Sequence, residues 1–438
     1  MIRSWVLVSA LLGLAAPLHS QDIAIRAGRF IDVVRDEIRE NQVILVRGNR
    51  VHGVQAARAP IPANIPIIDL SGYTVLPGLI DLHTHLVGDL QSADPLAPIK
   101  ATRDQEMAGG IRNARITLEA GFTTVRDVGT YRAFLDVALR DTIARFGVPG
   151  PRMVVAGPYL TIRGGAGEVT GDSTIRIPPE FRRGVANGVV EVRQKVGEIL
   201  EGGADFIKTL ATGAVLTQGT EPGVSEFTEE ELQVAVEEAT KRGTYVIAHA
   251  HGAEGIKNSV RAGVRSVEHG SLMDDEGIAL LRERGTWLVA DIFNGDYIAT
   301  EGRKQGWPED MLRKNDETTE TQRAAFRKAV AAGVRIGYGT DSGVYPHALA
   351  TAQLPYMVRY GMTPMQAVQS ATIEAARLLR MEDRLGSIVP GHLADIVAVE
   401  GDLLDVLQRL ADQPTGSWAV IPVPFIMKDG LVVKNERK

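Results

Sequence analysis

The chain has 438 residues, too many for one small core, so a large barrel or two domains are expected. Hydrophobic residues make up 44% and charged residues 23%, as in ordinary globular proteins, and the net charge of −6 with no basic stretch argues against a nucleic-acid partner. Cysteine is absent, which excludes disulfides, thiolate catalysis and sulfur-ligated zinc.

The first twenty residues differ from the rest of the chain. They hold an arginine near the start, an apolar run over 5–16 and small residues before Gln21. This pattern predicts a secretory signal peptide at 1–20 and therefore an exported protein, periplasmic or secreted. An uncleaved membrane anchor is the alternative, although the apolar run is short for a span. After removal of the signal we expect no membrane association, because no other segment is long and apolar enough.

Both ends of the remaining chain read as β structure. Short apolar segments with turns occupy 23–72, and similar segments occupy 393–402 and 423–435, the last with an Asp-Gly hairpin turn. We predict a small β-sandwich domain assembled from residues 21–78 and 386–438.

The middle of the chain, residues 79–385, alternates strand-like runs with amphipathic helices. The segment 227–243 is one such helix, with a capping box formed by Thr228 and Glu231. The strand candidates are 73–86, 122–129, 152–157, 204–213, 244–252, 264–270, 286–292 and 334–343. Eight near-continuous apolar strands separated by helices predict an α/β fold, a (β/α)8 TIM barrel. The alternative, an open doubly wound sheet, would have a glycine-rich phosphate turn after the first strand.

Polar residues stand at the carboxyl ends of these predicted strands, where a barrel gathers its catalytic residues. They are His83, His85, Lys208, His249, His251, His269 and Asp341. His83 and His85 are two residues apart, so they share one strand face and can bind one metal ion together. Nitrogen and carboxylate ligands suit zinc. Taken alone, each of these residues would be assigned a structural role, in the core or as a helix cap.

Lys208 leaves three interpretations open. It is a snorkelling surface amine, a catalytic base with a lowered pKa, or a lysine carboxylated by CO2, whose carbamate could bridge two metal ions. A charged, unpaired lysine at the end of an apolar strand would be costly, more so beside a dication.

The segments "VLPGLIDLHTHL", "GADFIKTLATG", "VIAHAHG", "SVEHG", "GTDSG" and "GSIVPGHLADIVAVEGD" together resemble the amidohydrolase superfamily. More narrowly they resemble its binuclear, prolidase-like and ochratoxinase-like branch, including bacterial ochratoxin-degrading members. The resemblance implies two divalent ions, expected to be Zn²⁺. His83 and His85 would bind the more buried ion, and carboxylated Lys208 would bridge it to a second.

By the same resemblance, His249 and His269 would bind the second ion, and Asp341 would contact the first ion and a bridging hydroxide. His251 would face the substrate. Packing roles are implied for Arg126 and Asp127. A homo-oligomer is also implied, with an octamer as one form.

One position departs from the family pattern, because Ala166 stands where relatives often have histidine. Arg163 nearby could bind a substrate carboxylate, since guanidinium forks suit that group, or be a solvated loop residue. His347 could line the pocket or be structural.

We therefore expect a metal-dependent hydrolase of linear amides: dipeptides and N-acyl amino acids, including aroyl-phenylalanines of the ochratoxin type. A metal-bridging hydroxide would attack, Asp341 would shuttle the proton, and His251 would hydrogen-bond the carbonyl oxygen. Two alternatives remain. One is a cyclic-amide or phosphotriester hydrolase on the same scaffold, and the other is a non-catalytic exported protein that binds metal or peptide.

Overall fold

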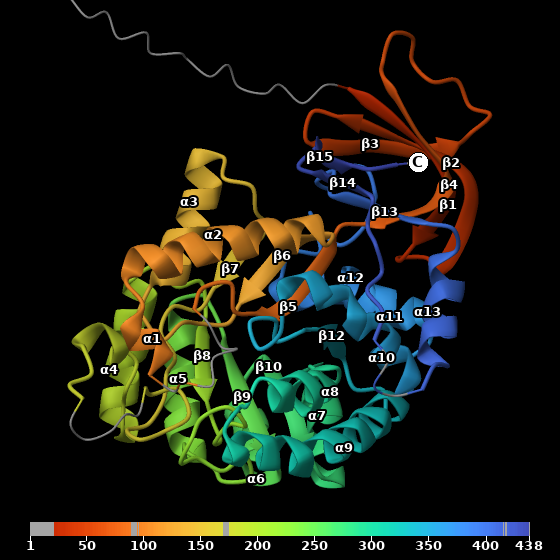
Figure 1. Cartoon of the computed structure of the whole chain (residues 1–438). Helices are drawn as coiled ribbons and strands as arrows, with labels where there is room; N and C mark the ends of the chain where they lie inside the picture. Colours follow the sequence, from red (N-terminus) through yellow and green to blue (C-terminus); the bar gives the residue numbers. More distant parts are fainter. Residues whose placement is uncertain are drawn as a thin grey trace, which may run out of the picture.

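The structure is a computed structural model that describes residues 22–88, 94, 96–169, 175–414, 416 and 418–437. The predicted signal peptide at residues 1–20 lies outside them. Within the described ranges, no helix is both long enough and apolar enough to pass through a bilayer. Figure 1 shows a β-rich part beside a larger part in which helices surround strands.

Strands from both ends of the chain form one seven-stranded sheet. β4 lies parallel to β1 and antiparallel to β13, so it joins the amino-terminal and carboxyl-terminal strands. Figure 1 shows these red and blue strands side by side. Their order is β15 (Leu431–Asn435), β14 (Phe425–Lys428), β13 (Ile396–Glu400), β4 (Ile67–Pro77), β1 (Ile23–Asp32), β2 (Glu37–Arg47) and β3 (Arg50–Ala56). The packing of two sheets in a sandwich stays a prediction.

Tight turns and a separate apolar core explain why these segments pair. Asp429 and Gly430 have φ of 51° and 74°, which is the backbone of a two-residue hairpin turn between β14 and β15. Ile25, Ile44 and Phe425, from three different strands, are fully buried in one cluster on this sheet. The cluster includes residues from both ends of the chain.

The eight predicted strand segments of the middle each contain a strand. Parallel ladders join them into a three-stranded and a five-stranded sheet, which confirms a mixed α/β fold with parallel sheets. The first sheet holds β5 (Leu79–Thr84), β6 (Phe122–Asp127) and β7 (Arg152–Val155). The second holds β8 (Ile207–Leu210), β9 (Val246–Gly252), β10 (Ser266–Leu272), β11 (Trp287–Ala290) and β12 (Ile336–Tyr338). Isolated parallel bridges, Leu160 to Thr209 and Thr84 to Ser342, link the two sheets.

The first predicted strand, 73–86, is divided in the structure. β4 ends at Pro77 in the seven-stranded sheet, and β5 begins at Leu79 among the parallel strands. Between them, Gly78 donates its N–H to Asp395, and a Cβ at Gly78 would lie 2.3 Å from the hydroxyl of Thr123. The chain therefore passes from one sheet to the other at a point where only glycine fits without a shift.

Helices follow the parallel strands and cover them, as Figure 1 shows. The predicted capping box of α5 is present, with Thr228 and Glu231 each bonded to the other's backbone, and Leu232 and Ala235 on this helix are buried. The longer helices are α2 (Arg103–Glu119), α3 (Leu135–Phe146), α4 (Gly188–Glu201), α5 (Glu229–Lys241), α6 (Ala253–Ala262), α7 (Asp275–Arg284), α9 (Glu309–Ala331) and α13 (Leu403–Ala411). The shorter ones are α1 (Ala97–Lys100), α8 (Asn294–Tyr297), α10 (Gln353–Arg359), α11 (Pro364–Ser370) and α12 (Ile373–Leu379).

Candidate metal centre and active site

Seven side chains from five strands meet around one cavity. Four ring-to-ring distances of 4.6–4.9 Å connect His83, His249, His251 and His269 in one cluster. The cavity measures about 1290 Å³, counting space that opens to solvent. All seven predicted strand-end residues line it: His83, His85, Lys208, His249, His251, His269 and Asp341. The parallel arrangement brings these residues together because it places the carboxyl ends of the strands on one side.

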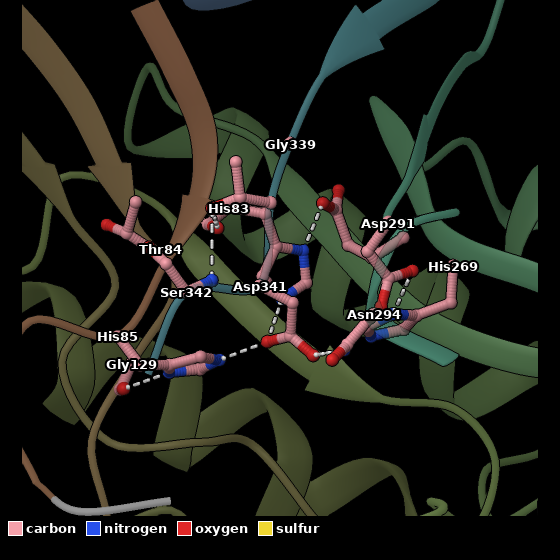
Figure 2. Close-up of polar contacts among 12 residues, drawn as sticks. His83, Thr84, His85, Gly129, His269, Asp291, Asn294, Gly339, Asp341 and Ser342 are labelled. Atoms are coloured by element: carbon pink, nitrogen blue, oxygen red, sulfur yellow. Dashed lines mark hydrogen bonds and ion pairs between the residues drawn. The ribbon is translucent and has the colours of Figure 1, made fainter. Parts of the chain in front are cut away.

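Figure 2 shows the carboxylate of Asp341 between the rings of His83 and His85 and the amide of Asn294. Its Oδ1 atom is 3.4 Å from Nε2 of His83 and 3.2 Å from Nε2 of His85. Its Oδ2 atom accepts a hydrogen bond of 3.0 Å from the amide of Asn294. One carboxylate oxygen and two imidazole nitrogens thus point at a common volume, which is the donor set of a divalent metal site.

The other nitrogen of each of three rings is bound to a partner outside the cluster. Nδ1 of His83 lies 2.9 Å from Glu268, and Nδ1 of His269 lies 3.0 Å from Asp291. Nδ1 of His85 lies 3.1 Å from the carbonyl oxygen of Gly129 (Figure 2). Carboxylate and carbonyl partners at Nδ1 place the proton there and leave Nε2 unprotonated toward the centre, as in metal-binding histidines.

The pKa values of the histidine rings depend on the charged groups beside them. Burial, and then the charge of Lys208, keeps the pKa of His83 well below its usual value. Burial also lowers the pKa of His269, but the charge of Asp291, its hydrogen bond to the ring and the charge of Asp341 together outweigh burial and raise that pKa overall. Neutral imidazoles are the form that binds metal.

Lys208 is buried among these groups. Its Nζ is 3.5 Å from Nε2 of His83, and burial lowers its pKa to about 8 although Glu268 and Asp341 oppose the shift. The amine and the imidazole nitrogen face each other without an oxygen between them. A carbamate on Nζ would supply oxygen donors at this place, so the residues fit a carboxylated lysine. The snorkelling interpretation is wrong, because the residue is only 2% exposed.

The donor atoms fall into two groups that can hold a metal ion, with His269 in both. One group is His83, His269 and Asp341, and the other is His249, His251 and His269, with ligand atoms within 4.8 Å of one another in each. His251 is therefore close enough to contribute a nitrogen, beyond the substrate-facing role implied for it. Its Nδ1 lies 2.7 Å from the hydroxyl of Ser271, which holds the ring in place.

Two of the central residues have an unusual backbone. His269 and Asp341 adopt φ of 69° and 56°, a region that residues other than glycine rarely occupy. His269 lies within β10, and Asp341 lies three residues after the end of β12. Such conformations persist where the surrounding structure holds them, and they occur often at active sites.

Two predicted substrate contacts lie elsewhere. Arg163 is exposed and is not among the residues that line the cavity; its backbone N–H donates to Asn187. His347 is buried and lines a smaller neighbouring cavity, and burial lowers its pKa to about 3. Ala166 does line the main cavity, where its N–H donates to Glu226 at 2.8 Å.

The sequence analysis did not identify the residues that orient the predicted metal ligands. Glu268 precedes His269 directly, and Asp291 is the next-to-last residue of the seventh predicted strand, so their positions carried a signal. Tyr159 donates to the carbonyl of Gly129 and lies 3.2 Å from Nδ1 of His85, and it lines the cavity. Nothing in its local sequence predicts this contact, because His85 is 74 residues away.

Comparison with known proteins agrees with this geometry. The model of the amidohydrolase family matches residues 74–434, a range that includes every residue of the cluster. The chain belongs to the amidohydrolase family.

Individual relatives place the chain within this family. It is 32% identical to ochratoxinase of Aspergillus niger over 354 residues, covering 76% of this chain and 71% of the relative. A solved Xaa-Pro dipeptidase with bound methionine in the active site is 36% identical with a TM-score of 0.86, over 94% of this chain and all of that one. The structure of A. niger ochratoxinase is 26% identical with a TM-score of 0.82, over 95% of this chain and 96% of that one.

The amidohydrolase therefore lies in the ochratoxinase-like and prolidase-like branch, as its motifs indicated. It is a hydrolase that acts on amide bonds. Its histidine and aspartate clusters have the composition of sites for divalent metal ions.

Proposed function

We propose that this amidohydrolase cleaves linear amides, namely dipeptides and N-acyl amino acids, with aroyl-phenylalanines of the ochratoxin type in the same class. The observation that carries the proposal is the Asp341 carboxylate, which lies 3.2–3.4 Å from two imidazole nitrogens on the wall of a large cavity. The similarity to a dipeptidase and to ochratoxinase supports a substrate with an amino acid on one side of the amide.

We further propose that the eight parallel strands close into a TIM barrel; the two bridges between the sheets support this. Two ions, Zn²⁺ by preference of the donors, would be held by His83, His85 and Asp341 and by His249 and His269, with a carboxylated Lys208 between them. Such ions polarise a carbonyl and make a bound water acidic near neutral pH.

The residues of the chain then have distinct tasks. Asp341 accepts the proton of the attacking water through Oδ1 and passes it to the departing nitrogen, so it acts first as base and then as acid. Asn294 donates to Oδ2 and thereby keeps Oδ1 turned toward the two rings. His251, held by Ser271, donates a hydrogen bond to the carbonyl oxygen as negative charge develops there.

The cavity wall supports a substrate with an apolar side chain. One side is lined by the aliphatic residues Leu216, Ile298, Met311 and Val344, which would exclude water from such a side chain. Asn315 and Gln322, on the same helix α9 as Met311, add polar side chains to the lining.

The variant Asp341→Asn tests the proton transfer. We expect turnover of an N-acyl amino acid to fall below a hundredth of the wild-type rate while much of the metal stays bound. The measurements are steady-state rates and metal content by mass spectrometry. A rate above a tenth of wild type would refute the role of Asp341. Release of a free α-amino acid supports linear amides, whereas a single ring-opened product would identify a cyclic-amide hydrolase instead.

The variant Lys208→Ala tests the carbamate. We expect metal content and activity both to fall, and a short carboxylic acid or excess bicarbonate to alter occupancy in the variant, because a small anion can take the place of the missing carbamate. Intact mass of the wild type under native conditions should show the added CO2. An active wild-type enzyme with an unmodified amine would contradict the assignment.

The proposal also covers the export, the location and the assembly of the protein. The leader at 1–20 directs export and is removed, the mature protein works outside the cytoplasm, and it assembles as a homo-oligomer. Sequencing of the mature amino terminus and a mass measurement in solution test these statements.

A further inference from the structure

A second large cavity lies at the opposite end of the same parallel strands. Tyr245, Arg265 and Arg335 directly precede β9, β10 and β12, whereas the metal-site residues stand at the carboxyl ends of those strands. The cavity measures about 1190 Å³, counting space open to solvent, and shares no lining residue with the catalytic cavity. Its charged lining residues are Arg265, Arg284, Arg335, Arg377, Arg380, Glu374 and Glu382.

Three of these five arginines have no partner for their charge. Within the described part of the chain, no ion pair or hydrogen bond involves the side chains of Arg284, Arg335 or Arg380. Arg377, in contrast, pairs with Glu374, and Arg265 donates to the carbonyl oxygen of Leu378 at the end of α12. The guanidinium groups that remain unpaired gather in one cavity, although the chain as a whole carries a net charge of −6.

Aromatic rings hold several of these guanidinium groups in place. Arg265 and Arg380 lie 5.4 and 5.5 Å from the centre of the Tyr245 ring, and Arg335 lies 5.7 Å from that of Trp287. Tyr245 in turn stacks on the buried ring of Phe206 at 5.5 Å. Stacking leaves the planar donor edges of Arg335 and Arg380 free, so these two groups are already arranged for an incoming ligand.

Repulsion at Arg265 has a cost that a bound anion would relieve. Five arginines against two glutamates leave a net charge of +3 on the cavity lining. Burial, and then repulsion from Arg380, lowers the pKa of Arg265. An oxyanion that accepts hydrogen bonds from two or three guanidinium forks would offset this repulsion.

We propose that this cavity binds a small molecule that carries a phosphate group, independently of the catalytic site. Phosphate matches the site in two respects: a phosphate monoester carries about 1.5 to 2 negative charges at neutral pH, and its oxygens accept paired hydrogen bonds from guanidinium. The space beyond the arginines accommodates the organic remainder of a phosphate monoester. The proposal stands apart from the proposed function, since the two cavities lie at opposite ends of the strands.

Calorimetric titration of the metal-loaded full protein with inorganic phosphate, and separately with glycerol 3-phosphate, tests this site. The test variant is Arg335→Gln with Arg380→Gln. The matched control is Arg58→Gln with Arg282→Gln, which removes the same charge from exposed arginines outside the cavity. We expect phosphate affinity to fall at least tenfold in the test variant and to stay within twofold of wild type in the control.

The wild type, the test variant and the control variant would all bind phosphate at the active-site metals. Only the difference in phosphate affinity between the two variants therefore measures binding in the second cavity. Equal phosphate binding by the test and control variants would overturn the proposal, as would the absence of binding by the wild type. Tighter binding of glycerol 3-phosphate than of phosphate would identify a monoester as the ligand. Urea unfolding without ligand shows whether the test variant is folded, and a second pair, Arg284→Gln against Arg282→Gln, repeats the comparison if it is not.

Discussion

At the residue scale, the orientation of His83, a proposed metal ligand, depends on a buried ion pair behind it. Arg126 and Glu268 are both fully buried, and the guanidinium donates to both carboxylate oxygens at 2.8 and 2.9 Å. The same carboxylate lies 2.9 Å from Nδ1 of His83. The packing role implied for Arg126 is thus also a positioning role, because its charge holds the acceptor that orients the ligand.

We predict that Glu268→Gln weakens both metal binding and folding. The amide cannot neutralise Arg126, and breaking a buried ion pair costs about 3–5 kcal/mol. Loss of the carboxylate at Nδ1 of His83 should lower metal affinity by about 10–100-fold. Urea unfolding and competition with a chelator measure the two effects. Glu283→Gln, an exposed change on α7, is the control, and equal behaviour of the two variants would contradict the prediction.

At the scale of elements, helix α9 supports the loop that forms one wall of the cavity. Lys314, fully buried on this helix, donates to the carbonyl oxygens of Thr217 at 2.8 Å and Thr220 at 3.1 Å. It also pairs with Asp310 at 2.9 Å on its own helix. The residues 214–218 of this loop line the cavity, so the position of that wall depends on α9.

We predict that Lys314→Met raises KM about tenfold while kcat changes less than threefold. The loop loses two hydrogen bonds from a charged donor, each contributing about 1.5–3 kcal/mol, but no catalytic group is touched. Lys328→Met, on the same helix, removes only an exposed pair with Asp275 and should leave both constants unchanged. If kcat fell tenfold at constant KM, the loop would not act through substrate binding.

At the scale of the whole molecule, one arginine joins the parallel strands to the seven-stranded sheet. Arg152 on β7 donates to Asp395 at 2.8 Å and to Asp429 at 2.6 Å, and the latter residue forms the turn between β14 and β15. Its guanidinium also donates to Thr124 on β6 at 2.8 Å. Ion pairs between mostly buried groups therefore connect the parallel strands to the carboxyl-terminal strands.

We predict that Arg152→Met lowers the free energy of unfolding by about 3 kcal/mol. This value is near the lower end of the cost of breaking a buried ion pair, because 20% of the Arg152 side chain is exposed. Urea unfolding measures the change. Arg145→Met removes an exposed pair with Asp141 and should cost less than about 1 kcal/mol. A similar loss in both variants would show that Arg152 does not connect the two parts in an energetically important way.

The sequence alone was enough to predict much of the fold and the central cluster. Apolar runs located all eight parallel strands, and the turn at Asp429 and the cap at Thr228 followed from neighbouring residues. Arg163 shows where such reasoning stops, because its exposure depends on how its loop packs. The division of the first strand at Pro77 likewise depends on Thr123, which is distant in sequence.

The sequence by itself determined which residues stand at the strand ends. Strand periodicity and the parallel arrangement depend on local patterns, and these patterns can be recognised in the sequence. Only the tertiary structure decided how each predicted ligand is oriented. Nδ1 of His83 meets a carboxylate 185 residues away, and that carboxylate meets a guanidinium 142 residues from itself. Such partners are selected by three-dimensional packing, because a hydrogen bond depends on distance and direction in space and not on separation along the chain.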